Sequence, residues 1–412
     1  PAFRHVDVPL ASTFMLSTKA GKEAYVEPVI EPGSAGGPPA YRFTVKAGKP
    51  RDSEAAKKGT KLARANFVCL MSGTPISGDY IKAEGMAGRM NARLMAIVAD
   101  GTHGRVYLPP TLDHEAIVRQ AQPEWTPDVT ISGSTQYLGV KPYGMERFSQ
   151  LFTDRQLVAL STFSDLALEA RERIRRDALN IGMSEGRGIA SGDINAIAYA
   201  EAVGVYLAFA VDKGANYWSA VCAWHQTRDG IVSTFGRQAI PMIWDYAEAN
   251  PLSDSTGNIL LGIEQASKML CGLGMGIPGL ASQQDAARQS ISTNKVVSTD
   301  PPYYDNVPYA DLSDFFYVWL RRSQRNVFSD LFATLAVPKT EELVAFAYRH
   351  DGKAGAEAFF LDGMTQAMCR LAEQAHPAFP TSIYYAFRQA ETDDEEGTAS
   401  TCLLYTSPSP RD

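Results

Sequence analysis

The chain has 412 residues, of which 45% are hydrophobic and 21% charged, an ordinary globular composition with room for two or three domains. No run of 18 or more apolar residues occurs and no signal peptide is visible, so the sequence predicts no membrane-spanning segment. The five cysteines are too sparse and irregular for a disulfide framework, which favours a reducing cytoplasm. The net charge of −7 argues weakly against nucleic acid as a partner, although such binding needs only a local basic face.

Two groups of arginines are candidates for a local basic face. They are Arg171, Arg173, Arg175 and Arg176, and then Arg321, Arg322 and Arg325. The simpler interpretation of each group is a solvated helix face.

The two ends of the chain look unnatural. The first residue is Pro1 and not Met, and residues 402–412 resemble translated adapter or vector sequence behind a broken reading frame. We therefore expect a fragment of a longer protein, and 402–412 is excluded from fold reasoning as a probable non-native tail.

Residues 1–140 predict a β-rich region of short strands and loops. Val26–Glu31 and Tyr41–Val45 carry the alternation of strands, and Ala92–Val98 and Gly104–Leu108 are further candidate strands.

Residues 141–270 predict a mostly helical region. Thr153 and Gln156 fit a capping box ahead of apolar residues at helical spacing, so a helix is expected from there to about Leu179. After a glycine-rich connection, Asp193 is expected to open a second helix.

Strands and helices alternate in residues 271–401, which favours an α/β fold with a parallel, doubly wound sheet. The expected elements, in chain order, are a helix over Gln283–Ser290, a strand over Lys295–Thr299, helices over Asp314–Arg325 and Ala354–Ala375, and a strand over Ser382–Phe387.

The most informative segment is Asp300-Pro301-Pro302-Tyr303, directly after the expected strand Lys295–Thr299. Ligand sites in open α/β sheets lie beyond the carboxyl ends of strands. The carboxylate of Asp300 and the carbonyl of Pro301 can accept hydrogen bonds from an exocyclic amino group, which orients its lone pair and stabilises developing positive charge. The two prolines stiffen the loop, and Tyr303 offers a face for stacking on a flipped-out base.

The tetrapeptide alone is also compatible with a structural turn, since Asp-Pro and Pro-Pro both mark turns. The strand before it favours a functional loop. So do the aromatic and polar residues after it, which are candidates for binding substrate: Tyr304, Asp305, Asn306 and Tyr309.

The stretch Ser298–Arg322 resembles the adenine-specific DNA methylases that carry a DUF1156 domain and a zinc ribbon. The resemblance covers the chain from about residue 8 to residue 401. Supporting stretches begin at Tyr143, Leu151, Thr234, Ala247, Asp254 and Tyr384.

The resemblance implies a Rossmann-like methyltransferase sheet with a β-rich and helical insertion before the catalytic loop. It implies transfer of a methyl group from S-adenosylmethionine (SAM) to the exocyclic N6 of a flipped-out adenine in DNA. Asp300, Pro301, Pro302 and Tyr303 carry over as the amine-binding loop. Asp285 is similar to the acidic position that contacts the adenine of SAM, although a solvated helix residue is the alternative.

The sequence departs from this family in two places. In these proteins the glycine-rich SAM loop would lie upstream of Pro1, and this chain holds no good copy of it, since the glycine cluster at 272–276 is more typical of a flexible connection. The zinc ribbon is degenerate or truncated, since Cys69 has Ser72 where a second cysteine ligand belongs. We expect Cys69 to be a small buried residue and no stable zinc to bind.

The sequence leaves several alternatives open. Cytosine N4 in DNA, or a base in RNA, presents the same kind of amino group as adenine N6. A protein glutamine is a less favoured substrate, because enzymes of that kind usually have Asn in the position of Asp300. A non-catalytic nucleic-acid-binding protein that retains the fold is the alternative from another class. DNA is the expected partner and a prokaryotic cytoplasm the expected location, and the sequence does not identify a protein partner.

Overall fold

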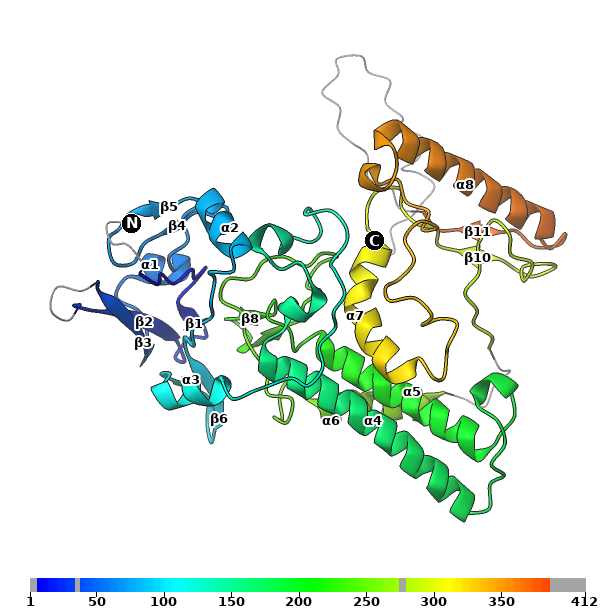
Figure 1. Cartoon of the computed structure of the whole chain (residues 1–412), viewed down its shortest axis with the longest axis horizontal. Coiled ribbons are helices and arrows are strands. Elements are labelled where there is room, and N and C mark those ends of the chain that lie inside the picture. Colours follow the sequence, from blue (N-terminus) through cyan, green and yellow to red (C-terminus); the bar gives the residue numbers. More distant parts are fainter. Residues whose placement is uncertain (1–5, 34–37, 274–278, 386–412) are drawn as a thin grey trace. The chain divides into compact units, whose positions relative to one another are not determined.

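The computed structural model describes residues 6–33, 38–273 and 279–385 of the chain (Figure 1). These residues form helices and several small, separate sheets, so the architecture is mixed α/β. Within them, every helix is too short or too polar to cross a membrane. The expected non-native tail lies outside the described residues.

The chain divides into two compact units. The first unit takes the residues up to Ser282 together with Pro308–Glu342. The second takes Gln283–Val307 together with the residues from Leu343 onward. This division differs from the three regions expected from the sequence, because Pro308–Glu342 joins the first unit instead of the expected catalytic region.

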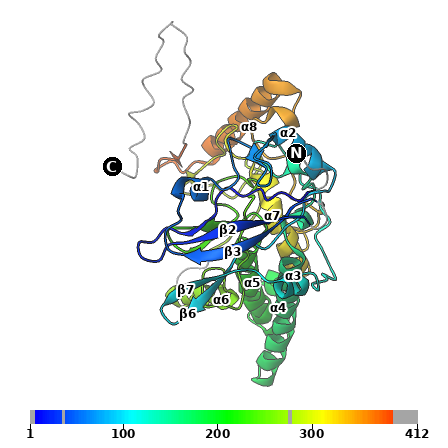
Figure 2. The same cartoon turned by 90° about the vertical axis from the view of Figure 1, so that its left-hand side faces the viewer.

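A three-stranded antiparallel sheet organises the N-terminal part of the first unit (Figure 2). It consists of β1 (Met15–Ser17), β2 (Ala24–Glu31) and β3 (Ala40–Ala47), with the latter two close to the predicted strands. Val26 and Phe43 are buried in its hydrophobic core, as the alternation predicts.

A hairpin of β6 (Ile97–Gly101) and β7 (Gly104–Leu108) follows. The expected strand over Ala92–Val98 was wrong for its first five residues. The hairpin turn fixes the register so that Ile97 pairs with Leu108, and the residues before Ile97 therefore have no partner strand.

Shorter elements complete the β-rich part and its connections. They are α1 (Ser53–Lys58), β4 (Phe67–Val68), β5 (Pro75–Ile76), α2 (Gly78–Met86), α3 (Leu112–Val118), β8 (Ala223–His225), β9 (Gly230–Val232) and the 3-10 turns η2 (Lys141–Tyr143), η3 (Phe148–Leu151) and η4 (Ile189–Ser191).

Two long helices, α4 (Asp154–Asn180) and α5 (Ala196–Ala215), pack against each other in the first unit (Figure 1). Thr153 caps α4, and Gln156 completes the predicted capping box. The second helix begins later than expected from Asp193, because the side chain of Asn195 accepts the amide of Ala198 and acts as the N-cap.

Two further helices lie against this pair. Helix α6 (Ile259–Gly272) packs on α5, and α7 (Tyr309–Gln324) packs on both α4 and α5. The buried face of α7 presents Phe315 and Trp319 to the ring of Phe152, at centroid distances of 5.4 Å in both cases. These rings form part of the core of the first unit.

The second unit contains two short parallel strands and one long helix. Strands β10 (Ser298–Thr299) and β11 (Ser382–Ile383) pair in parallel, and α8 (Gly352–Gln374) lies between them in the sequence. The chain enters α8 through the 3-10 turn η5 (Ala347–Arg349). The other described sheets are antiparallel, so a larger Rossmann-like sheet stays a prediction.

The helix expected over Gln283–Ser290 is wrong, since this segment forms turns. Asp285 accepts the amide of Ala287 through its side chain, which offers the backbone an alternative to a helix. The carbonyl of Gln289 accepts from Arg370 and Gln374 of α8. The turn is therefore fixed by residues of α8, and the spacing of apolar residues within Gln283–Ser290 carries no information about these partners.

Candidate functional site

The segment Asp300–Tyr303 follows β10 directly, at the carboxyl end of the parallel pair. At the end of β10, the amide of Tyr384 donates to the carbonyl of Thr299 at 2.8 Å. Pro301 is buried and Asp300 is exposed. The sheet therefore holds the start of the loop in place and leaves the carboxylate accessible.

The hydroxyl of Tyr303 donates a hydrogen bond of 2.6 Å to Oδ1 of Asp300. The ring of Tyr303 also meets the ring of Tyr385 edge-to-face, with 5.6 Å between the centroids. Tyr385 follows β11 as Asp300 follows β10, so both strand ends contribute to one cluster. A carboxylate has about four acceptor positions, so Asp300 can accept a second donor while it holds Tyr303.

The carbonyl groups of the loop differ in whether they accept a backbone hydrogen bond. The carbonyl of Pro302 accepts the amide of Tyr304 at 3.2 Å, and the carbonyl of Tyr303 accepts the amide of Asn306 at 2.9 Å. Within the described residues, no donor is bonded to the carbonyl of Pro301. The two acceptors that an amino group requires, a carboxylate and a carbonyl, are thus both present in one stiff loop.

Tyr304 anchors the loop. Its backbone adopts the left-handed region with φ of 49°, which is strained for a residue with a large side chain. The amide of Ala345 donates to its carbonyl at 3.0 Å, and its ring packs edge-to-face on Phe360 of α8 at 5.2 Å. Burial, followed by the charges of Glu357 and Asp305, raises the pKa of Tyr304. The ring expected to bind substrate is therefore packed against the hydrophobic cluster of α8.

The other expected substrate residues are divided between the two units. Asp305 and Asn306 are exposed and continue the loop in the second unit. Tyr309 is exposed as well, but it opens α7 in the first unit. The structure therefore brings Asp305 and Asn306, and not Tyr309, into the same compact unit as Asp300.

The turn that contains Asp285 and the candidate loop contact different parts of α8. The Asp285 turn is held by Gln374 at the end of α8, whereas the loop is held by Phe360. These two α8 residues are about 21 Å apart along the helix axis at 1.5 Å per residue. Asp285 is exposed, and Arg288 lies 3.5 Å from its carboxylate. The described contacts of Asp285 are with Ala287 and Arg288, and its role in SAM binding stays a prediction.

The other cofactor and metal candidates of the sequence are the glycine cluster at 272–276 and Cys69. Most of the glycine cluster at 272–276 lies outside the described residues. Cys69 is buried as expected, and burial alone would raise the pKa of its thiol, but hydrogen bonds from Ser72 and Met71 lower it. In the part of the chain that the structure describes, no three His, Cys, Asp or Glu side chains gather as a metal site would require.

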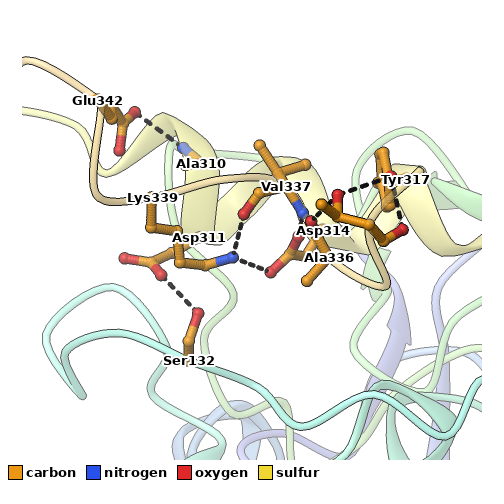
Figure 3. Close-up of polar contacts among 10 residues, drawn as sticks. Ser132, Ala310, Asp311, Asp314, Tyr317, Ala336, Val337, Lys339 and Glu342 are labelled. Atoms are coloured by element: carbon orange, nitrogen blue, oxygen red, sulfur yellow. Dashed lines mark hydrogen bonds and ion pairs between the residues drawn. The ribbon is translucent and has the colours of Figure 1, made fainter. Parts of the chain in front are cut away.

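The acidic residues of α7, which belong to the stretch behind the motif, have structural partners in the first unit (Figure 3). Asp314 is fully buried, and its carboxylate accepts the amide of Val337 and the ammonium group of Lys339, both at 2.7 Å. Burial raises the pKa of Asp314, and the hydrogen bonds from Lys339 and Val337 oppose that rise. The contacts of Asp314 with Val337 and Lys339 therefore hold the segment after α7 against the helix.

Two more carboxylates fix the start of α7. Ser132 donates to Oδ1 of Asp311 at 2.6 Å, and Glu342 accepts the amide of Ala310 at 2.9 Å (Figure 3). Glu342 therefore caps a helix whose first residues precede it by about thirty positions. This explains why α7 begins at Tyr309 and not at the expected Asp314.

Most arginines of the two candidate basic groups are engaged within the first unit. Arg175 pairs with Glu172 and Glu185, each at 2.9 Å. Arg322 donates to both oxygens of Asp165, and its guanidinium lies 4.6 Å from the ring centroid of Trp125. These contacts favour the simpler interpretation, a helix face with its own counter-charges.

Sequence reasoning assigned no role to Tyr385, Ala345 or Phe360. Tyr385 lay inside the expected strand Ser382–Phe387, whereas β11 ends at Ile383 and leaves Tyr385 beyond the strand end. Ala345 and Phe360 had no signal in the sequence, because their role depends on how α8 packs against the loop.

Comparison of the chain with protein-family models, with curated proteins and with solved structures finds no match.

Proposed function

We propose that the chain is part of a SAM-dependent methyltransferase that modifies the exocyclic amino group of a nucleic-acid base, with adenine N6 in DNA as the substrate. The observation that carries the proposal is the loop Asp300–Tyr303 at the carboxyl end of β10, where a carboxylate and a ring lie together with a backbone carbonyl that accepts from no described residue. The resemblance of Ser298–Arg322 to adenine-specific DNA methylases supports the same conclusion.

The roles of the loop residues follow from the poor nucleophilicity of an aromatic amine. One N–H would donate to Asp300 and the other to the Pro301 carbonyl, which turns the nitrogen lone pair out of conjugation with the ring. Tyr303 would stack on the base after it leaves the helix. The hydrogen bond between Tyr303 and Asp300 holds the carboxylate in position before the base arrives.

SAM would supply an electrophilic methyl group. Within the described residues, Asp285, which the resemblance assigns to SAM, has its contacts with Ala287 and Arg288. We therefore propose roles only for the residues that would hold and orient the base.

The test uses the complete product of the gene and labelled SAM. Unmodified DNA is incubated with the protein, digested to nucleosides and separated. Label in N6-methyladenine supports the proposal, and label in N4-methylcytosine would identify cytosine N4 in DNA as the substrate instead. The absence of label from DNA, for folded protein that binds SAM, would overturn the DNA assignment.

A further inference from the structure

The first unit contains a cavity at the N-terminal end of α4. Its volume is about 380 Å³, within the range of about 300–1,000 Å³ that is typical of small-molecule sites. Its walls combine apolar and polar side chains, among them Ala159, Trp218, Pro251, Arg155, Gln156 and Glu248. This mixture of apolar surface with a few polar groups is typical of sites that bind small molecules.

Gln156 is a polar residue of the wall whose amide nitrogen has no partner. The side chain is only 5% exposed, and its Oε1 atom accepts the backbone amide of Thr153 at 2.8 Å. Because a backbone amide can only donate, this contact fixes which end of the side chain is the oxygen. Within the described residues, the buried Nε2 atom donates to no acceptor. A buried donor without an acceptor is unfavourable, so a bound acceptor would stabilise it.

The cap of α4 requires only the oxygen of Gln156. A capping box accepts Glu or Gln at this position, because either supplies an oxygen for the N-cap amide. Gln150 provides a comparison, since its side-chain oxygen accepts the amides of Glu146 and Arg147 while the side chain is exposed to water. The buried nitrogen of Gln156 therefore contributes nothing to the cap and is available to an acceptor in the cavity.

An ion pair makes the polar part of the wall neutral. Arg155 donates to one carboxylate oxygen of Glu248, and the hydroxyl of Thr153 donates to the other. A charged ligand would be attracted by one member of this pair and repelled by the other. The wall therefore favours a neutral molecule that accepts a hydrogen bond.

Trp218 gives the cavity a fixed apolar wall. Its indole nitrogen donates to the carbonyl of Gly257 at 2.6 Å, and its ring lies 5.5 Å from that of Phe163 between centroids. A wall that is already held in place loses little entropy when a ligand packs against it. The apolar body of a ligand can therefore rest on Trp218, Ala159 and Pro251.

We propose that this cavity binds a small neutral molecule with an amide or lactam carbonyl on an apolar body, and that the carbonyl oxygen accepts from Nε2 of Gln156. Because Nε2 is covered in the structure, binding includes a side-chain rearrangement that uncovers it, a common adjustment at binding sites. The inference goes beyond the proposed function, since it concerns the first unit and requires neither SAM nor DNA.

The test measures binding of three probes of similar size to the complete protein by saturation-transfer difference NMR. Benzamide is neutral and carries the carbonyl, benzoate is anionic, and aniline is neutral and has no carbonyl. For benzamide we expect a Kd on the order of 1–10 mM, which is usual for a fragment of this size. Benzoate and aniline should each bind at least about fivefold more weakly. Tighter binding of either one than of benzamide would overturn the inference.

Two variants of Gln156 remove the amide nitrogen in different ways. Gln156→Glu keeps the oxygen that caps α4, and Gln156→Met keeps the side chain neutral. We expect each to weaken benzamide binding at least about fivefold, the effect of one lost hydrogen bond. Ala159→Leu fills part of the cavity and should weaken the binding of benzamide to a similar extent. Melting temperatures show which variants are folded.

The matched control is Gln150→Glu, the same substitution at an exposed capping glutamine, which should bind benzamide as the wild-type protein does. An equal loss in this control, or unchanged binding by folded Gln156→Met protein, would overturn the inference. So would the absence of benzamide binding to the wild-type protein at about 50 mM, well above the expected Kd. If both Gln156 variants unfold, Ala159→Leu decides, because unchanged benzamide binding by that variant would exclude this cavity as the site.

Discussion

Tyr303 donates a 2.6 Å hydrogen bond to the carboxylate of Asp300, three residues earlier in the same loop. The same tyrosine ring faces Tyr385 from the neighbouring strand end. In the proposed site, Tyr303 would therefore have two separable functions, orientation of the carboxylate through its hydroxyl and stacking on the base through its ring.

Substitution of Tyr303 separates these functions. Tyr303→Phe removes the hydroxyl and keeps the ring, so methyl transfer at saturating DNA should fall about tenfold, the effect of losing a hydrogen bond of about 1.5 kcal/mol to a charged group. Tyr303→Ala should in addition raise KM for DNA, because stacking is worth about 1–3 kcal/mol per base. Steady-state kinetics of the two variants check this. Identical KM values for the Phe and Ala variants would exclude a stacking role.

Packing between Tyr304 and Phe360 holds the strained part of the loop. Phe360→Ala should lower the free energy of unfolding by about 3–5 kcal/mol, the usual cost of truncating a buried phenylalanine. Thermal unfolding followed by circular dichroism measures the change. Leu361→Ala is the matched control, since Leu361 is next in the sequence and 56% exposed. Similar losses in both variants would contradict the anchoring role of Phe360.

The ion pair between Asp314 and Lys339 is buried on the Asp314 side. Lys339→Met should destabilise the protein by about 3 kcal/mol, because it leaves a buried carboxylate without its counter-charge. Protonation of Asp314 relieves this cost, so the loss should be larger at pH 8 than at pH 4. The control is Lys82→Met, whose partner Asp79 is 94% exposed and for which we expect less than about 0.5 kcal/mol. A pH-independent loss in the Lys339 variant would argue against a charge effect.

Burial raises the pKa of Asp212 on α5 well above its ordinary value, and the buried Oδ1 atom accepts no hydrogen bond within the described residues. The folded state therefore binds this proton more tightly than the unfolded state. Its contribution to stability is fully present below the ordinary pKa near 3.8 and is lost as pH rises through the raised pKa. Asp212→Asn should thus stabilise the protein at pH 8 and have little effect near pH 3.5. Urea unfolding of both proteins across this range tests the sign, and a gain that is constant with pH would refute it.

The sequence predicted those elements whose signals are local. The capping box of Thr153 and Gln156 lies within four residues, so the start of α4 was predicted correctly. The start of α7 was not, because its capping carboxylate comes from Glu342. The helix expected over Gln283–Ser290 failed for a related reason, since α8 binds the carbonyl of Gln289 from more than eighty residues away.

The candidate site follows the same pattern. The position of Asp300 after a strand could be predicted from β-branched residues and a Pro-Pro break. The cluster with Tyr385 could not, because it depends on the parallel pairing of two strands joined by a long crossover. The assignment of Tyr304 to substrate overlooked Phe360, which becomes its neighbour only when α8 packs on the loop.

The central claim is that Asp300 and its loop orient a base amino group for methylation. The most direct test compares the complete wild-type protein with Asp300→Ala in single-turnover transfer of labelled methyl from SAM to DNA, with SAM binding and melting temperature measured for both. We predict labelled N6-methyladenine from the wild-type protein and at least a 1,000-fold slower reaction, about 4 kcal/mol, from a variant that folds and binds SAM normally. Equal rates for the two proteins would contradict the claim.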